Sequence, residues 1–174
     1  SPRLATERHR VAEQVEAGER VVDMFAGVGP FAVPMAARGA EVLACDVNPA
    51  AIGYLRGNAE RNAVGDRITA LEGDVRETTA EYTDWADRVV MNLPHSADEF
   101  LDTAVRIAGD DCVLHLYDMA HEDDPFGPGE RAIREVAEPA GYEVEVLTRR
   151  EVRSYAPHEL NVCLDVRIRR PSVV

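Results

Sequence analysis

The stretch VVDMFAGVGPF, residues 21–31, decides the fold of this 174-residue chain. Its apolar beginning predicts a strand over residues 20–25, and glycines follow at positions 27 and 29. Glycine adopts positive φ without strain and lets a ligand approach the main chain closely. In open α/β sheets, ligands bind at the carboxyl ends of the strands. The stretch therefore predicts a ligand site where the first strand of such a sheet ends.

Strands and helices alternate on either side of this stretch. Two β-rich runs close the chain without a helix between them, so we expect an antiparallel hairpin whose connection, 152–159, is too long for a tight turn. Asn48 and Ser96 are typical helix caps. The pattern predicts one α/β domain over residues 1–174, with a seven-stranded, mostly parallel sheet and a C-terminal antiparallel hairpin. The expected helices are 4–16, 30–38, 49–63, 97–108 and 129–139, and the expected strands are 20–25, 41–46, 68–71, 87–92, 112–117, 142–150 and 160–169.

The composition is unusually acidic. Aspartate and glutamate total 32 against 19 basic residues, and all 19 are arginine because the chain has no lysine. Such a surface is typical of halophilic archaea, where molar salt shortens the Debye length to about 3 Å. Net charge therefore does not exclude a nucleic-acid partner. We expect an archaeal, halophilic, cytoplasmic and monomeric protein.

Neither a membrane span nor a metal centre is expected. No apolar run approaches the length of about 20 residues that a membrane span needs, and the N-terminus lacks a signal peptide. The three cysteines lie far apart, and neither they nor His115 and His121 show metal-ligand spacing. We predict buried, reduced thiols and no bound metal.

Polar residues end four successive strands. Asp23, Asp46, Asp74 and Asn92 all fall where a parallel sheet brings carboxyl ends to one edge. A carboxylate after the second strand accepts from ribose hydroxyls in both nicotinamide and S-adenosylmethionine enzymes. The antiparallel C-terminal strands favour the class I methyltransferases, which have a Rossmann-like fold. We expect S-adenosylmethionine to contact Asp23, Phe25, Ala26, Gly27, Gly29, Asp46, Val47, Asn48, Asp74, Val75 and Asn92, although Phe25 also fits a core position.

The sequence resembles the archaeal and eukaryotic tRNA (guanine-37-N1)-methyltransferases over nearly its whole length. The matching stretches are SPRLATERHRV (1–11), VVDMFAGVGPFAVPMA (21–36), CDVNPAAIGYLRGNAERN (45–62), DRVVMNLPHSADEFLDTA (87–104) and RSYAPHELNVCLDV (153–166). The resemblance implies methyl transfer to N1 of the guanine 3′ of the anticodon, with the tRNA anticodon loop as partner. It also implies a further N-terminal tRNA-recognition domain, so we expect this chain to be a fragment.

The same resemblance implies catalytic roles for four residues. Glu7 resembles the general base, Arg3 helps to shape the active site, and Asn92 and Pro94 form the target-base pocket. Guanine N1 carries a proton at neutral pH, and a buried carboxylate can remove it. Negative charge then spreads to O6, where the Asn92 amide can donate. Taken alone, Glu7 also fits a helix-surface glutamate paired with Arg3 or Arg10.

Two alternatives remain open at this level. One is a methyltransferase of the wybutosine pathway that acts on a modified guanine. The other, from a different class, is a nicotinamide oxidoreductase or a non-catalytic nucleotide-binding module. The C-terminal arginines, at 149, 150, 153, 167, 169 and 170, fit an RNA-facing patch and an ordinary charged hairpin equally well. His95 is interpreted as a local hydrogen-bonding residue.

Overall fold

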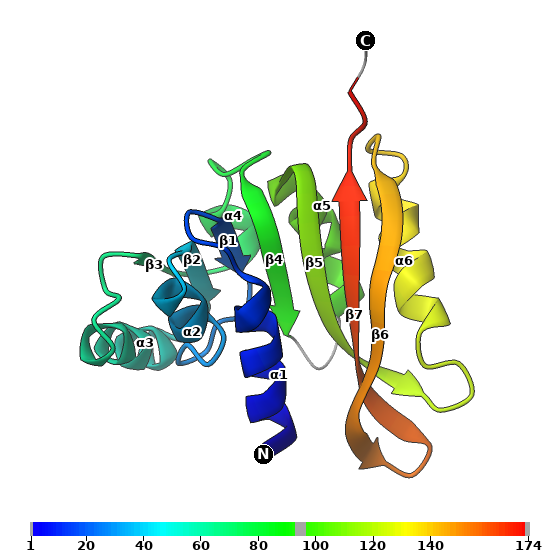
Figure 1. Ribbon diagram of the computed structural model, residues 1–174, viewed down its shortest axis with the longest axis horizontal. Coiled ribbons are helices and arrows are strands. Elements are labelled where there is room, and N and C mark those ends of the chain that lie inside the picture. The colour runs from blue at the N-terminus through cyan, green and yellow to red at the C-terminus, as the bar shows by residue number, and fades with distance from the viewer. Residues whose placement is uncertain (1, 93–96, 173–174) are drawn as a thin grey trace. The chain divides into compact units, whose positions relative to one another are not determined.

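A computed structural model describes residues 2–92 and 97–172 (Figure 1). The chain divides into two compact units, Ser1–Tyr82 and Thr83–Val174. Its seven strands follow the order β3-β2-β1-β4-β5-β7-β6. The predicted α/β class, with a seven-stranded sheet and antiparallel C-terminal strands, is confirmed.

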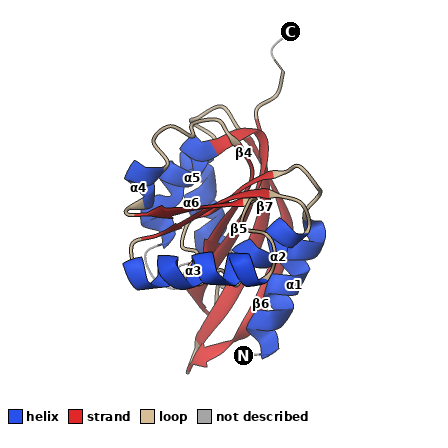
Figure 2. Cartoon of the chain, turned by 90° about the vertical axis from the view of Figure 1, so that its left-hand side faces the viewer, coloured by secondary structure: helices blue, strands red, loops and turns tan. Residues whose placement is uncertain are grey.

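The first unit is a parallel βα arrangement. Its strands pair in parallel, with Asp23 of β1 opposite Ala44 and Asp46 of β2 opposite Glu72. Asn48 accepts from the Ala50 N–H at 3.0 Å and so caps α3 as predicted. Helices α2 and α3 pack against β2 and β3 (Figure 2). The elements are α1 (Pro2–Gln14), β1 (Arg20–Asp23), α2 (Ala32–Ala37), β2 (Glu41–Asp46), α3 (Pro49–Arg61), β3 (Ile68–Glu72) and α4 (Val75–Thr78).

The second unit combines a parallel and an antiparallel part. Strands β4 and β5 are parallel, whereas β7 runs antiparallel to both β5 and β6. Helices α5 and α6 lie on one side of these strands, behind them in Figure 1. The elements are β4 (Ala86–Asn92), a 3-10 helix (Ala97–Phe100), α5 (Leu101–Ile107), β5 (Ala108–His121), α6 (Gly127–Ala137), β6 (Glu143–Ala156) and β7 (Glu159–Arg169).

The C-terminal hairpin corrects one prediction. The connection expected over 152–159 is wrong, because β6 continues to Ala156 and pairs there with Glu159. Only Pro157 and His158 form the loop, and His158 has a φ of 65°, a conformation that sequence signals associate with glycine. Its ring stacks on that of His121 at 6.2 Å between centroids. The Glu122 N–H also donates to the His158 carbonyl at 2.9 Å, so this turn without glycine is tied to the end of β5.

Several boundaries also differ from the predictions. Strand β5 extends well beyond 112–117, α2 is shorter than 30–38, and α4 was not predicted. The helix expected over 97–108 begins as a 3-10 turn, and its predicted cap, Ser96, lies outside the described residues. The three cysteines are buried and unbonded to one another, as predicted. Among the helices that the structure describes, none is both long and apolar enough to cross a membrane.

Candidate functional site

The glycine-containing loop after β1 is shaped by its own main chain. The Ala26 N–H donates to the Cys45 carbonyl at 2.8 Å, which ties the loop to β2. Gly27 and Gly29 have φ values of 57° and 97°, in the region that favours glycine. A Cβ at Gly29 would also lie 2.6 Å from Leu55 Cδ1 of α3. Gly29 is therefore required both by its conformation and by close packing.

Asp46, the last residue of β2, joins the loop to the next helix. Its Oδ2 accepts from the Gly27 N–H and its Oδ1 from the Asn48 N–H, both at 2.9 Å. Each carboxylate oxygen has a second lone pair, so Asp46 can still accept from a ligand hydroxyl. The neighbouring Val47 side chain is 70% exposed. The structure thus brings together Gly27, Asp46, Val47 and Asn48 as the sequence predicted.

Asp23, at the end of β1, is buried without compensation. It is 1% exposed, and neither carboxylate oxygen has a hydrogen-bond partner among the described residues. Burial raises the pKa of Asp23 to about 7; the nearby Phe25 N–H opposes this, and the Asp46 charge adds to it. S-Adenosylmethionine carries a sulfonium and an ammonium group, and a buried carboxylate with open lone pairs fits a cationic ligand. The buried Asp23 carboxylate is therefore the feature of the site that fits the positive charge of the predicted cofactor.

Asp74, which follows the third strand, already forms hydrogen bonds within the protein. The Gly73 N–H donates to the Asp46 carbonyl at 2.9 Å, which holds this turn beside β2. Asp74 caps α4 by accepting from the Arg76 N–H, and it also binds the Arg76 guanidinium. That hydrogen bond holds the pKa of Asp74 below its usual value. Val75 is buried, so only its main chain can face a ligand.

Glu7, the predicted base, lies on α1 in the first unit. Its carboxylate accepts from Arg10 Nη2 at 3.0 Å and from Arg10 Nε at 3.2 Å. The i,i+3 ion pair considered from the sequence is therefore present, yet Glu7 is only 1% exposed and is not a surface residue. Arg3, one helical turn earlier, is exposed.

The other two residues of the predicted catalytic set belong to the second unit. Asn92 is the last residue of β4, is partly buried, and lies opposite Tyr117 of β5. Pro94 and His95 lie outside the described residues. Asn92 thus stands at a strand end as predicted, and the role of Pro94 stays a prediction.

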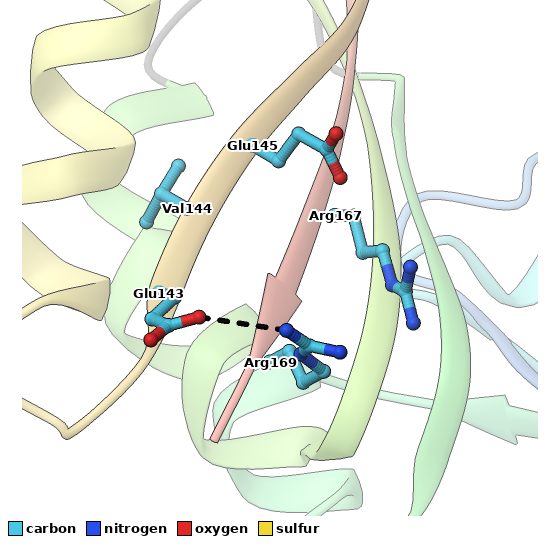
Figure 3. Close-up of a pocket in the computed structure, with 5 residues that line it drawn as sticks. All are labelled: Glu143, Val144, Glu145, Arg167 and Arg169. Carbon is cyan, nitrogen blue, oxygen red and sulfur yellow. Dashed lines mark ion pairs between the residues drawn. The ribbon is translucent and has the colours of Figure 1, made fainter. Parts of the chain in front are cut away.

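The C-terminal arginines are mostly neutralised by neighbouring acids. Arg149 pairs with Glu130, and Arg167 pairs with Asp111. Figure 3 shows Arg169 pointing to Glu143, at 3.6 Å, in an open pocket of about 290 Å³ lined by acids and arginines. These pairs favour an ordinary charged hairpin over an RNA-facing patch.

Two contacts at the site were not predicted from the sequence. Asn58 of α3 donates to the Val28 carbonyl at 2.8 Å and so supports the glycine loop from the side. The Arg76 guanidinium donates to the Asp74 carboxylate, as described above. Asn58 carries no local sequence signal, because its role depends on how α3 crosses the loop.

Comparison with known proteins identifies close relatives. The family model described as the TRM5/TYW2 methyltransferase domain matches residues 1–146. The tRNA (guanine(37)-N(1))-methyltransferase Trm5b of Pyrococcus abyssi is 46% identical over 97% of this chain and 49% of its own length. Its crystal structure superposes with a TM-score of 0.89 at 47% identity, covering 97% of this chain and 50% of the other.

A second group of relatives has a different named activity. The tRNA(Phe) (4-demethylwyosine(37)-C(7)) aminocarboxypropyltransferase of Pyrococcus horikoshii is 35% identical over 97% of this chain and 60% of its own length. The structure of Methanocaldococcus jannaschii TYW2 in complex with AdoMet has a TM-score of 0.88 at 32% identity, covering 98% and 78% of the two chains. The chain spans about half the length of the Trm5b relative.

Proposed function

Because the chain belongs to the TRM5/TYW2 methyltransferase domain family, we propose that it binds S-adenosylmethionine and methylates N1 of guanine 37 in tRNA. The cofactor assignment is carried by Asp23, a buried carboxylate for which the described part of the chain offers no hydrogen-bond partner, beside a glycine loop that Asp46 holds in place. The acceptor assignment is supported by 46% identity to the Pyrococcus abyssi Trm5b enzyme over nearly the whole chain.

The first unit supplies most of the proposed cofactor site. Gly27 and Gly29 let the main chain approach the ligand, and Asp46 accepts from ribose hydroxyls. Asp23 balances the positive charge, and the exposed Val47 side chain offers an apolar surface to the adenine. Phe25, Ala26, Asn48, Asp74, Val75 and Asn92 complete the proposed contacts.

When bound, S-adenosylmethionine supplies an electrophilic methyl group, whose bond electrons return to sulfur as the methyl passes to nitrogen. Glu7 accepts the N1 proton of guanine, which frees the nitrogen lone pair for attack. The Asn92 amide donates to O6, where negative charge accumulates. Pro94, which lies outside the described residues, completes the proposed target-base pocket. Arg3 helps to shape the pocket.

Transfer of labelled methyl groups to tRNA transcripts tests the proposal. Transcripts with guanine or adenine at position 37 are compared in molar potassium chloride, with the chain alone and with the complete gene product. Guanine-dependent incorporation that Glu7→Gln abolishes is expected. Glu13→Gln, an exposed glutamate on the same helix, is the matched control and retains activity. Equal incorporation into both transcripts would refute the guanine assignment.

Aminocarboxypropyl transfer is the second candidate, and the Pyrococcus horikoshii relative favours it. S-Adenosylmethionine labelled separately in the methyl carbon and in the methionine carboxyl carbon distinguishes the two. Methyl label alone in the tRNA supports the first proposal. Carboxyl label alone supports the second. Assaying both a guanosine and a modified-guanosine tRNA also tests methylation of a wybutosine precursor.

Composition supports the assignment to a salt-rich cytoplasm, whereas the single domain and the monomer are the simplest assignments for one chain of this length. We infer a single methyltransferase domain that works as a monomer in the salt-rich cytoplasm of a halophilic archaeon, since its 19 basic residues are all arginine and acids outnumber them. A nicotinamide oxidoreductase is tested by melting: S-adenosylhomocysteine is expected to raise Tm and NAD is not. A rise with NAD alone would overturn the cofactor assignment.

A further inference from the structure

Three buried ionisable side chains on neighbouring strands of the second unit form one hydrogen-bonded network. Arg88 Nη1 of β4 lies 2.8 Å from His115 Nε2 of β5, and His115 Nδ1 lies 2.7 Å from Asp165 Oδ1 of β7. The three side chains are 5%, 0% and 1% exposed, respectively. The network therefore lies inside the protein rather than on its surface.

Hydrogen-bond chemistry fixes the protonation of the central residue. A guanidinium only donates, so His115 Nε2 must accept from Arg88. The proton of the neutral imidazole then sits on Nδ1 and is donated to Asp165. Cys163 adds a weak S–H donor to the same aspartate oxygen at 3.4 Å. The network carries one positive and one negative charge joined by a neutral ring, and this pairing offsets the cost of burial.

Strand register places His115 and Asp165 one row before Asn92 along the same face of the sheet. Val90 lies opposite His115, and Asn92 lies opposite Tyr117, which in turn lies opposite Cys163. Since side chains alternate along a strand, Arg88 and Asn92 are on the same face of β4, and His115 shares that face on β5. The row that contains Asn92 is thus the next row along the sheet from the row that contains His115 and Asp165.

Main-chain pairing between β4 and β5 is regular from Arg88 to Asn92 and irregular only just before Arg88. The register between β4 and β5 shifts between Ala86 and Arg88, immediately before the strand reaches the network. The Arg88 side chain spans from the shifted end of β4 to the ring on β5, and the ring is fixed in turn to β7. The side chains therefore connect three strands at the point where the β4 ladder is irregular.

We propose that Arg88, His115 and Asp165 are positioning residues that fix the carboxyl end of β4, and with it Asn92, for methyl transfer. This inference rests on the proposed role of Asn92 in the target-base pocket. A displacement of about 1 Å at a reacting centre can slow an enzyme about 100-fold. The network contacts β4 through Arg88, four residues before Asn92, so it affects the rate by setting the position of the strand that carries Asn92.

The first test combines His115→Leu with Asn92→Ala in the complete gene product. His115→Leu is expected to lower kcat for guanine-37 tRNA about tenfold or more. In the Asn92→Ala background, the same substitution should lower kcat little further, because His115 acts through Asn92. His121→Asn, an exposed histidine on the same strand, is the control. Equal losses of kcat in both backgrounds would overturn the proposal.

Two further measurements test the proposal if His115→Leu does not fold or if the wild-type protein shows no activity. If His115→Leu does not fold, the triple variant Arg88→Met/His115→Leu/Asp165→Leu replaces the whole network with apolar side chains. Proteins often remain folded when a buried ion network is replaced in this way. Full kcat in the triple variant would overturn the proposal. The Asn92 side-chain amide resonance is recorded by NMR without substrate. It should shift in His115→Leu and not in His121→Asn. An unchanged resonance rejects the positioning role even if the wild-type protein shows no methyl transfer.

Discussion

Two buried aspartates, one in each unit, have opposite surroundings. Asp23 and Asp165 are both 1% exposed and both lie in strands. Asp165 accepts from His115 at 2.7 Å and belongs to a network that includes Arg88. Asp23 has no hydrogen-bond partner among the described residues. The two aspartates are equally buried but differ in energy, because hydrogen bonds within the protein offset the desolvation cost of Asp165 and not that of Asp23.

The difference supports a structural role for Asp165 and the proposed ligand-binding role for Asp23. A protein gains nothing in stability from an uncompensated buried charge, so such a group indicates that its partner comes from outside. Asp23 lies at the end of β1, beside the glycine loop, where a cationic ligand can complete its hydrogen bonds. Asp165 already has its partners, so its contribution is to hold strands in place.

The largest expected effect is the pH dependence that Asp23 imposes on folding. Burial raises its pKa from the ordinary value of 3.8 to about 7 in the folded protein. Between these values the folded protein holds a proton that the unfolded chain has lost. The free energy of unfolding should therefore fall by about 4 kcal/mol from pH 4 to pH 7 and level off above. Guanidinium denaturation across this range measures it.

Asp23→Asn isolates this contribution from the other titrating groups. The variant should lack most of the slope and be the more stable protein at pH 8, although the buried amide also lacks partners. Its affinity for S-adenosylmethionine should fall. Asp66→Asn, at an exposed position, is the matched control and should keep the slope. An unchanged slope in Asp23→Asn would show that Asp23 is compensated after all.

The same substitution at the other aspartate should have the opposite sign. Asp165→Asn keeps an oxygen for the His115 N–H but removes the charge that balances Arg88, and breaking a buried pair is costly. The free energy of unfolding should fall by about 3 kcal/mol at pH 7. Chemical denaturation of the two asparagine variants side by side measures the contrast. Stabilisation by both would remove the distinction between the two sites.

The aspartate that we propose to bind the ligand could be predicted from the sequence, and the aspartate of the buried network could not. Asp23, Asp46 and Asp74 each follow an apolar strand, and parallel strands bring such ends to one edge, so local pattern predicts them. His115 and Asp165 are separated by 50 positions and meet only because β5 and β7 pair in one register. No local period encodes that register.

The antiparallel hairpin was predicted correctly, but its connection over 152–159 was wrong for a related reason. Residues 151–156 are exposed or partly buried except Val152, so their hydrophobic pattern is too weak to mark a strand. The turn signal is absent too, because His158 takes positive φ in place of glycine. Pairing with β7 nevertheless extends β6 to Ala156. Tertiary pairing overrides local pattern there, as it does in β5.

A smaller effect tests whether the loop beside Asp23 is as tightly built as its hydrogen bonds indicate. Gly29→Ala introduces a Cβ at a φ of 97° and 2.6 Å from Leu55 Cδ1, which should cost about 2 kcal/mol of stability. Gly53→Ala lies on α3 with no atom within 4 Å and should gain about 1 kcal/mol. Thermal melts with and without S-adenosylhomocysteine measure both. A Gly29→Ala protein with normal stability would show that the loop is adaptable.

The smallest expected effect is that of salt on stability, which distinguishes the contribution of surface charges from that of the two buried aspartates. The net charge of −13 is spread over the surface, and about 1 M potassium chloride shortens the Debye length to about 3 Å. Screening should raise stability by about 1 kcal/mol, or about 3 °C in Tm, in all variants alike. The stability difference between Asp23→Asn and Asp165→Asn should not change, because buried charges are screened much less. If salt removed that difference, the two carboxylates would have to be accessible to ions, and neither would be a buried site.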